Sequence, residues 1–153
     1  MSALPRPSAW LRAAAVLTAL YALLHAAGRP WSPAHDVAAA AVAAGMRAVH
    51  FSAEGLERNY WDFYQGFGIA ISVLVGAQAL LLWQLATLAR DTGRYRAMAL
   101  IHLGAMLGIA VIAARFIFAL PALMALLIAA CLGIALLGAP EKGRSVRSPA
   151  AGL

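Results

Sequence analysis

Charged residues and cysteine are both scarce in this sequence. Of its 153 residues, 12% are Asp, Glu, Lys or Arg, which is about half of the share usual in soluble domains. Cys131 is the single cysteine, which excludes an intramolecular disulfide and any redox reaction that needs a cysteine pair. The sequence also lacks a Walker loop, a dinucleotide-binding fingerprint and a nucleophile elbow, so no common nucleotide or hydrolase motif points to an activity.

Apolar residues fill the chain instead. They make up 63% of it, and the mean hydropathy is +0.79. Four stretches approach or exceed the roughly 20 helical residues that cross a hydrocarbon core about 30 Å thick. The sequence therefore predicts an all-α membrane protein, a four-transmembrane-helix bundle in one domain (1–140) with a disordered cytoplasmic tail (141–153). The expected spans are about 10–27, 63–89, 96–115 and 116–138.

The first span has a second interpretation as a signal peptide. Arg6 and Arg12 precede an apolar run that ends in a stretch of small residues at Gly28, as a secretory signal does. The length of the run and the presence of His25 within it favour a retained span.

The basic residues lie at the ends of the spans and form no patch with interleaved aromatics, so nucleic acid is not an expected partner. If both termini are cytoplasmic, eight of the twelve Lys and Arg lie inside and four of the six acids lie outside. This positive excess predicts that orientation. Eleven Arg against one Lys, with abundant Ala, is typical of a GC-rich bacterial genome, so the expected location is the bacterial inner membrane.

The long connection from Gly28 to Tyr60 is expected to contain a short helix. Ser32 can cap it, Pro33 suits its first position, and the Ala-rich stretch that follows ends near His50. The ten uncharged residues between the charges at positions 36 and 47 are about half of what a span requires. We therefore expect a helix on the outer membrane surface or over the mouth of the bundle.

Small residues at helical spacing predict which faces of the spans meet, because lipid supplies no hydrophobic drive between helices. Internal packing explains such stripes more often than a dimer face does, so the oligomeric state stays open. The stripes are Gly68, Ser72 and Gly76 in the second span, Gly104 and Gly108 in the third, and Ala125, Ala129 and Gly133 in the fourth.

Polar residues at the outer ends of the spans are expected to converge on these lines. At 100° per residue, the line of Gly68, Ser72 and Gly76 is continued to within about 60° if the helix begins before position 58, and Arg115 lies near the line of the third span. The residues that continue it, and that are expected to face inward, are Arg58, Trp61, Asp62 and Gln65. Asp62 would then accept from Arg58 or Arg115, with Glu57 pairing with the remaining Arg. The predicted ligand-binding residues of this outward-facing polar pocket are His25, Glu57, Arg58, Tyr60, Trp61, Asp62, Tyr64, Gln65 and Arg115. A structural ion-pair staple with aromatic anchors at the membrane interface fits the same residues.

No metal or cofactor is expected. His25, His35, His50, Glu57 and Asp62 are the candidate ligands on the outer side, and no pair among them has a recognised ligand spacing.

The segment Arg58-Asn-Tyr-Trp-Asp-Phe-Tyr-Gln-Gly-Phe-Gly68 resembles a motif in a group of small bacterial four-span membrane proteins without an established activity. The resemblance covers most of the chain and implies the four-span architecture, with no chemistry attached. It makes the signature positions Arg58, Tyr60, Asp62, Tyr64, Gly66 and Gly68.

Three functions remain open from the sequence. The polar pocket would bind a lipid or a small amphipathic ligand, as in a transport accessory. Alternatively the protein is a membrane enzyme, isomerase-like, in which His25 or Asp62 transfers protons on an apolar substrate. A third alternative is a structural subunit whose partner packs on the lipid-facing side of the bundle. In each case the lipid bilayer is the surrounding partner.

Overall fold

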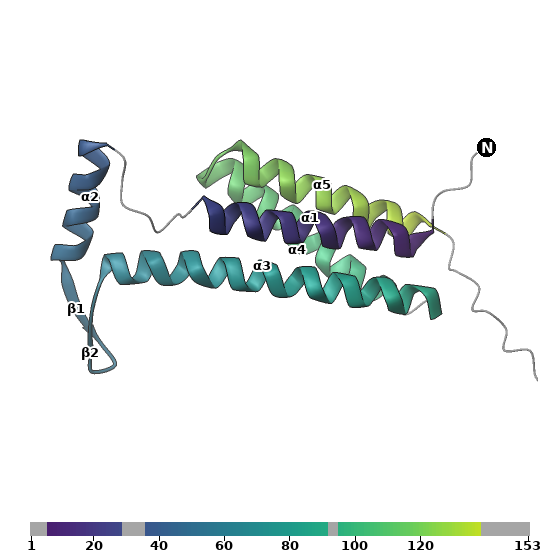
Figure 1. Cartoon of the computed structure of the whole chain (residues 1–153), viewed down its shortest axis with the longest axis horizontal. Helices are drawn as coiled ribbons and strands as arrows, with labels where there is room; N and C mark the ends of the chain where they lie inside the picture. The colour runs from purple at the N-terminus through teal and green to yellow at the C-terminus, as the bar shows by residue number, and fades with distance from the viewer. Residues whose placement is uncertain (1–5, 29–35, 92–94, 139–153) are drawn as a thin grey trace, which may run out of the picture. The chain divides into compact units, whose positions relative to one another are not determined.

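Helices account for most of the computed structural model, which describes residues 6–28, 36–91 and 95–138. The predicted tail at 141–153 and the predicted helix cap Ser32 lie outside these residues. In chain order the elements are α1 (Pro7–Ala27), α2 (Val37–Ala48), β1 (His50–Ala53), β2 (Leu56–Asn59), α3 (Tyr60–Asp91), α4 (Tyr95–Phe116) and α5 (Ala119–Leu137) (Figure 1).

Four of these helices are long and apolar enough to cross a membrane. They are Pro7–Ala27, Tyr60–Ala89, Tyr95–Phe116 and Ala119–Leu137. A helix bonds its backbone polar groups internally, which is the condition for a segment exposed to lipid. The prediction of an all-α chain with four long apolar helices is confirmed, and it indicates a multi-pass membrane protein. Each predicted span agrees with its helix to within three residues at both ends.

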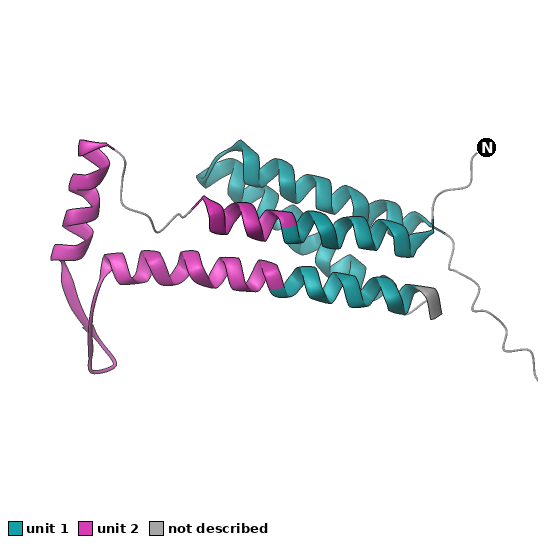
Figure 2. Cartoon of the chain, in the orientation of Figure 1, with its two compact units in different colours: residues 1–19, 77–153 teal, residues 20–76 magenta. Residues whose placement is uncertain are grey.

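The described chain divides into two compact units. Unit 1 contains residues 1–19 and 77–153, and unit 2 contains residues 20–76 (Figure 2). The helices α1 and α3 each contribute one half to each unit. Each unit has its own internal contacts.

In unit 1, α4 and α5 pack along each other as a helical hairpin. The contact face of α4 includes Ala99, Ala110 and Ala113, which are at most 5% exposed. On α5, Ala125 and Ala129 are similarly buried. Small side chains let the two backbones approach closely, and dispersion contacts then hold helices together where lipid cannot.

The predicted packing stripe of the third span is wrong. Gly104 and Gly108 are exposed on α4, and a Cβ added to either would meet nothing within 4 Å. The alanines of the neighbouring face provide the close approach instead, because alanine is small enough for helix contact. The predicted stripes of the other spans agree in part. Gly68 on α3 and Ala125 on α5 are buried, whereas a Cβ added to Gly76 or Gly133 would meet nothing within 4 Å.

One end of unit 1 is tied together by contacts to the end of α5. The hydroxyl of Tyr95 donates to the carbonyl of Ala135 at 3.2 Å, and the guanidinium of Arg96 donates to the carbonyl of Leu136. These bonds satisfy carbonyl groups in the last turn, which have no partner within their own helix. Pro7 also lies against this end, since a Cβ added to Gly138 would be 2.9 Å from the Pro7 Cγ.

In unit 2, α2 begins later than predicted. Asp36 has an extended backbone and its carboxylate accepts from the amide of Ala39 at 2.7 Å. It is therefore the N-cap of α2, and Pro33, which the sequence placed at the first position of this helix, lies outside the described residues. The helix still ends near the predicted position, at Ala48.

A β-hairpin that the sequence did not predict follows α2. Strands β1 and β2 are antiparallel, and Ala53 pairs with Leu56 across a two-residue turn. Glu54 and Gly55 in that turn have φ values of 51° and 78°. Positive φ at both central residues is the condition for the type I′ turn, whose twist matches that of the two strands.

We expect Gly55→Val to loosen the hairpin, because a β-branched residue resists positive φ by about 1–2 kcal/mol. Hydrogen exchange of the β1 and β2 amides should then accelerate roughly tenfold, with the α4 and α5 amides unchanged. Glu54→Gly is the matched control and should slow exchange in the hairpin, since it relieves positive φ at a residue with a Cβ. Equal exchange in both variants would contradict this account of the turn.

Candidate functional site

The start of α3 is set by a reciprocal pair of hydrogen bonds. The amide of Asn59 donates to the Asp62 carboxylate at 3.0 Å, and the amide of Asp62 donates to the side-chain oxygen of Asn59 at 2.9 Å. This is a capping box, which satisfies two amides of the first turn at once. The helix therefore begins at Tyr60 and Arg58 lies in β2. The prediction that Arg58 continues the helical line of α3 is wrong for this reason.

One face of α3 is buried, and it carries part of the predicted site. Trp61 is 8% exposed, and Gln65 is half-buried one turn later. The guanidinium of Arg47 lies 4.1 Å from the centre of the Trp61 ring, and Tyr64 packs on the same ring at 5.4 Å. The burial of Trp61 and Gln65 agrees with their predicted inward direction, whereas Asp62 is exposed and its predicted inward direction is wrong. The contacts of Trp61 fasten α2 to the first turns of α3.

Further along this face, α3 is bonded to α1 within unit 2. The Nδ1 atom of His25 is 2.9 Å from the Ser72 Oγ, and this hydroxyl donates to the carbonyl of Gly68 at 3.3 Å. Both bonds form together when His25 carries its proton on Nδ1 and donates to Ser72. His25 is therefore an interhelical hydrogen-bond partner on the buried face, of the kind that joins membrane helices.

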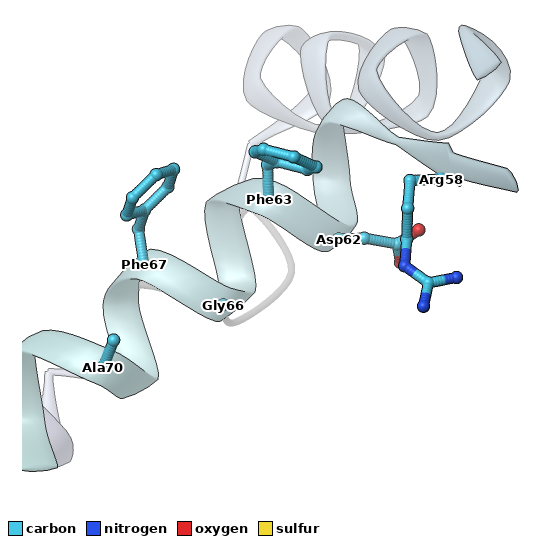
Figure 3. Close-up of a pocket in the computed structure, with 6 residues that line it drawn as sticks. All are labelled: Arg58, Asp62, Phe63, Gly66, Phe67 and Ala70. Atoms are coloured by element: carbon cyan, nitrogen blue, oxygen red, sulfur yellow. The ribbon is translucent and has the colours of Figure 1, made fainter. Parts of the chain in front are cut away.

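The opposite face of α3 lines a groove. Its cavity of about 340 Å³ lies beside side chains from the end of β2 and the first three turns of α3. In Figure 3, Arg58 and Asp62 lie together at one end and Ala70 lies at the other. Gly66 has no side chain there, which leaves the space between neighbouring turns open. The lining residues are Arg58, Asp62, Phe63, Gly66, Phe67 and Ala70.

Aromatic contacts fix the hairpin to the side of this groove. Phe51 of β1 lies 5.2 Å from the ring of Tyr60 and 5.2 Å from that of Phe63, which in turn is 6.1 Å from Phe67. Aromatic pairs at such distances are stabilised beyond their buried area. Phe51 also pairs with Arg58 across the hairpin. The aromatic contacts therefore place Arg58 at the end of the groove.

The two charged groups of the groove are held by the main chain. One oxygen of Asp62 accepts from the Asn59 amide, while Arg58 Nη1 donates to the carbonyl of Glu57 at 2.8 Å. Each of the two groups therefore bonds a main-chain group, where the sequence predicted an ion pair between Arg58 and Asp62. The Glu57 side chain is exposed. Both Arg58 and Asp62 are themselves exposed, so the remainder of each group can meet a ligand.

The remaining predicted residues lie outside the groove. Tyr60 and Tyr64 are exposed on the first turns of α3. Arg115 is exposed in the last turn of α4, in unit 1, with its guanidinium 5.3 Å from the ring of Phe116. Its expected inward direction followed from the line of Gly104, which is exposed. The contact between Arg115 and the predicted pocket residues of unit 2 stays a prediction.

Sequence reasoning missed the apolar part of the groove. Phe63, Gly66, Phe67 and Ala70 follow the spacing of one helical face. In a span that is apolar on every side, this spacing does not distinguish one face from the others. Among the described residues, no group of three His, Cys, Asp or Glu could hold a metal ion.

We expect the capping box to couple the effects of Asn59 and Asp62 on the free energy of unfolding. Asn59→Ala and Asp62→Ala should each lower the free energy of unfolding by about 1 kcal/mol. The double variant should lose less than the sum by about 0.5 kcal/mol or more, because the loss of either side-chain bond loosens the turn in which the other bond forms. The measurement is reversible unfolding in detergent. Strong coupling of Asp62 with Arg58 and none with Asn59 would favour the ion-pair staple.

No family model, no curated protein and no solved structure matches this chain. The resemblance to the small four-span bacterial group stays a prediction, and function is argued from the site itself.

Proposed function

We propose that this membrane protein binds an amphiphilic molecule in the groove of α3, as a carrier or accessory in transport. The groove joins charges of both signs to an apolar floor, and this single observation carries the proposal. Arg58 and Asp62 provide the charges, and Phe63 and Phe67 provide apolar surface along the helix (Figure 3). A ligand that fits must itself have a polar head and an apolar body.

The head group that suits these charges is zwitterionic. A phosphate would bind the guanidinium of Arg58, which offers paired donors in a planar fork. An ammonium group would bind the carboxylate oxygen of Asp62 that takes no part in the capping box. Phosphatidylethanolamine has both groups a few bonds apart and is therefore the lipid class that we favour.

The size of the groove agrees with binding of a head group and the first part of a chain. Its volume of about 340 Å³ lies at the lower end of small-molecule sites, which enclose about 300–1,000 Å³. An acyl chain would continue along α3 beyond Ala70, where Val73 and Leu74 are more than 60% exposed. The rest of the ligand then stays in the bilayer.

The proposed location is the bacterial inner membrane with both termini in the cytoplasm. The excess of basic residues on that side supports it. The hairpin and the groove would then lie at the outer surface, where aromatic residues such as Tyr60 and Tyr64 suit the interface. A groove at that depth meets lipid head groups directly.

Binding is better supported than proton transfer. An isomerase-like reaction would require His25 and Asp62 to act on one substrate. Within unit 2, His25 is bonded to Ser72 on the buried face of α3, and Asp62 lines the groove on the other face.

We expect Gly66→Leu to fill the groove and lower retention of phosphatidylethanolamine roughly tenfold, a loss of about 1.4 kcal/mol. A Cβ at Gly66 meets nothing within 4 Å, and leucine favours a helix over glycine by up to about 1 kcal/mol, so the fold should not suffer. The matched control is Gly108→Leu, an exposed glycine on α4 with equally open space. Native mass spectrometry of the purified protein with added lipid measures retention. If both variants retain lipid like the unmodified protein, the groove is not the site.

The orientation can be tested with single cysteines in a Cys131→Ala background. Ser52 is exposed in β1, and Ser52→Cys should react with a membrane-impermeant maleimide on intact spheroplasts. Ser148→Cys, in the tail, should react only after the membrane is opened. The reverse pattern would place the groove on the cytoplasmic side.

A further inference from the structure

Arg12 is an arginine within a membrane-spanning helix that has no carboxylate partner in the described structure. It lies five residues after the start of α1, about 7.5 Å along the helix axis. Its guanidinium lies 5.3 Å from the centre of the Trp83 ring of α3, within unit 1. The Arg12 Nε atom is buried and has no hydrogen-bond partner among the described residues.

Stacking on Trp83 does not satisfy Arg12. A cation–π contact uses the face of the ring and the charge of the guanidinium. The N–H groups of arginine lie in the plane of the guanidinium and still need acceptors. A buried donor without an acceptor costs about 1–3 kcal/mol, and more when it is charged. The position therefore favours an acceptor with negative charge.

Unit 1 does not supply that acceptor from its described side chains. The acidic side chains that the structure describes are Asp36, Glu54, Glu57 and Asp62, and all of them belong to unit 2. The described arginines of unit 1 are Arg6, Arg12, Arg96 and Arg115. A compact unit with this balance of charges attracts an anion.

Three of these arginines lie toward the same end of unit 1. Arg6 directly precedes Pro7, which lies against Gly138 at the end of α5. Arg96 donates to the carbonyl of Leu136, two residues before Gly138. We call this group, Arg6, Arg12 and Arg96, the basic end.

We infer that the basic end binds the phosphate of an anionic phospholipid, with Arg12 as its direct ligand. The site is separate from the groove of α3 and does not rest on the function proposed for it. The terminal nitrogens of the Arg12 guanidinium, which are not among its buried atoms, donate to the phosphate oxygens as a charge-assisted pair, and Trp83 holds the plane of the guanidinium. Arg6 and Arg96 raise the local concentration of the anion.

A lipid fits this position better than a soluble anion. Trp83 is 45% exposed, and Leu80 and Leu81 on the preceding turn are 71% and 59% exposed. Tryptophan at such a place suits the boundary between head groups and hydrocarbon. The exposed leucines offer an acyl chain a surface on the same helix.

The test is binding of phosphatidylglycerol against phosphatidylcholine, measured by native mass spectrometry of the full-length protein. The unmodified protein should retain phosphatidylglycerol preferentially. Arg12→Gln should lower that preference roughly tenfold, as expected for one charge-assisted contact. Arg12→Lys keeps the charge but loses the fork, so we expect it to retain part of the preference and to show that the fold is intact.

Arg115→Gln is the matched control. Arg115 also lies 5.3 Å from an aromatic ring, that of Phe116, and belongs to the same unit. It is not at the basic end, so its change should leave the preference for phosphatidylglycerol as it was. Equal losses in Arg12→Gln and Arg115→Gln would mean general attraction by positive charge and would overturn the site.

Two further outcomes would also overturn the inference. If inorganic phosphate displaces the lipid at comparable concentration, the site binds a soluble anion. If Asp91→Asn abolishes the effect of Arg12→Gln, the partner of Arg12 is that carboxylate. The groove variant Gly66→Leu should leave phosphatidylglycerol binding intact, so the two sites can fail independently.

Discussion

The capping box between Asn59 and Asp62 fixes the start of α3, and with it the side of the helix on which each residue of the segment 60–68 lies. A helix that begins at Tyr60 turns Trp61 and Gln65 toward the buried face, together with Gly68 and Ser72. The same start turns Asp62, Phe63, Gly66 and Phe67 to the other side, where they line the groove. Since each residue adds 100° of rotation, a register displaced by one residue would turn both sets of side chains by about 100° and move Trp61 away from the buried side. The reciprocal bonds at the first turn are thus the origin of both surfaces.

The two faces of α3 do different work because different interactions are available to each. The buried face carries hydrogen bonds and close contacts, such as His25 with Ser72 and Arg47 with Trp61. In lipid these contacts replace the hydrophobic drive that joins helices in water. The groove face keeps charged groups exposed beside aromatic rings. Such an arrangement gains little from folding alone and is therefore better explained by an external partner.

The long elements of this fold could be predicted from the sequence, and the surface of the site could not. Uninterrupted apolar length identifies α1, α3, α4 and α5 because backbone groups in lipid must be bonded within the helix. The hairpin has no comparable signal, since Glu54-Gly55 is a weaker turn dipeptide than Asn-Gly or Asp-Gly. The prediction of the packing face of α4 failed because alanine and glycine both permit close packing. A line of glycines therefore does not identify the side of the helix that contacts its neighbour. Trp61 and Gln65 were oriented correctly, whereas Arg58 and Asp62 were not. Arg58 precedes the helix, and the Asp62 carboxylate bonds the amide of Asn59 on the exposed side.

Five arginines in the described part of the chain are held in place without a carboxylate partner there. Arg12, Arg47 and Arg115 lie on aromatic rings, while Arg58 and Arg96 donate to main-chain carbonyls. A ring or a carbonyl carries no net charge, so each contact orients the guanidinium and leaves its charge to act on other groups. An ion pair would do the opposite, because it cancels the field that attracts an anion. A membrane protein that needed these arginines only for stability would gain more from pairing them with acids. Their placement agrees with the proposed binding of lipid phosphates.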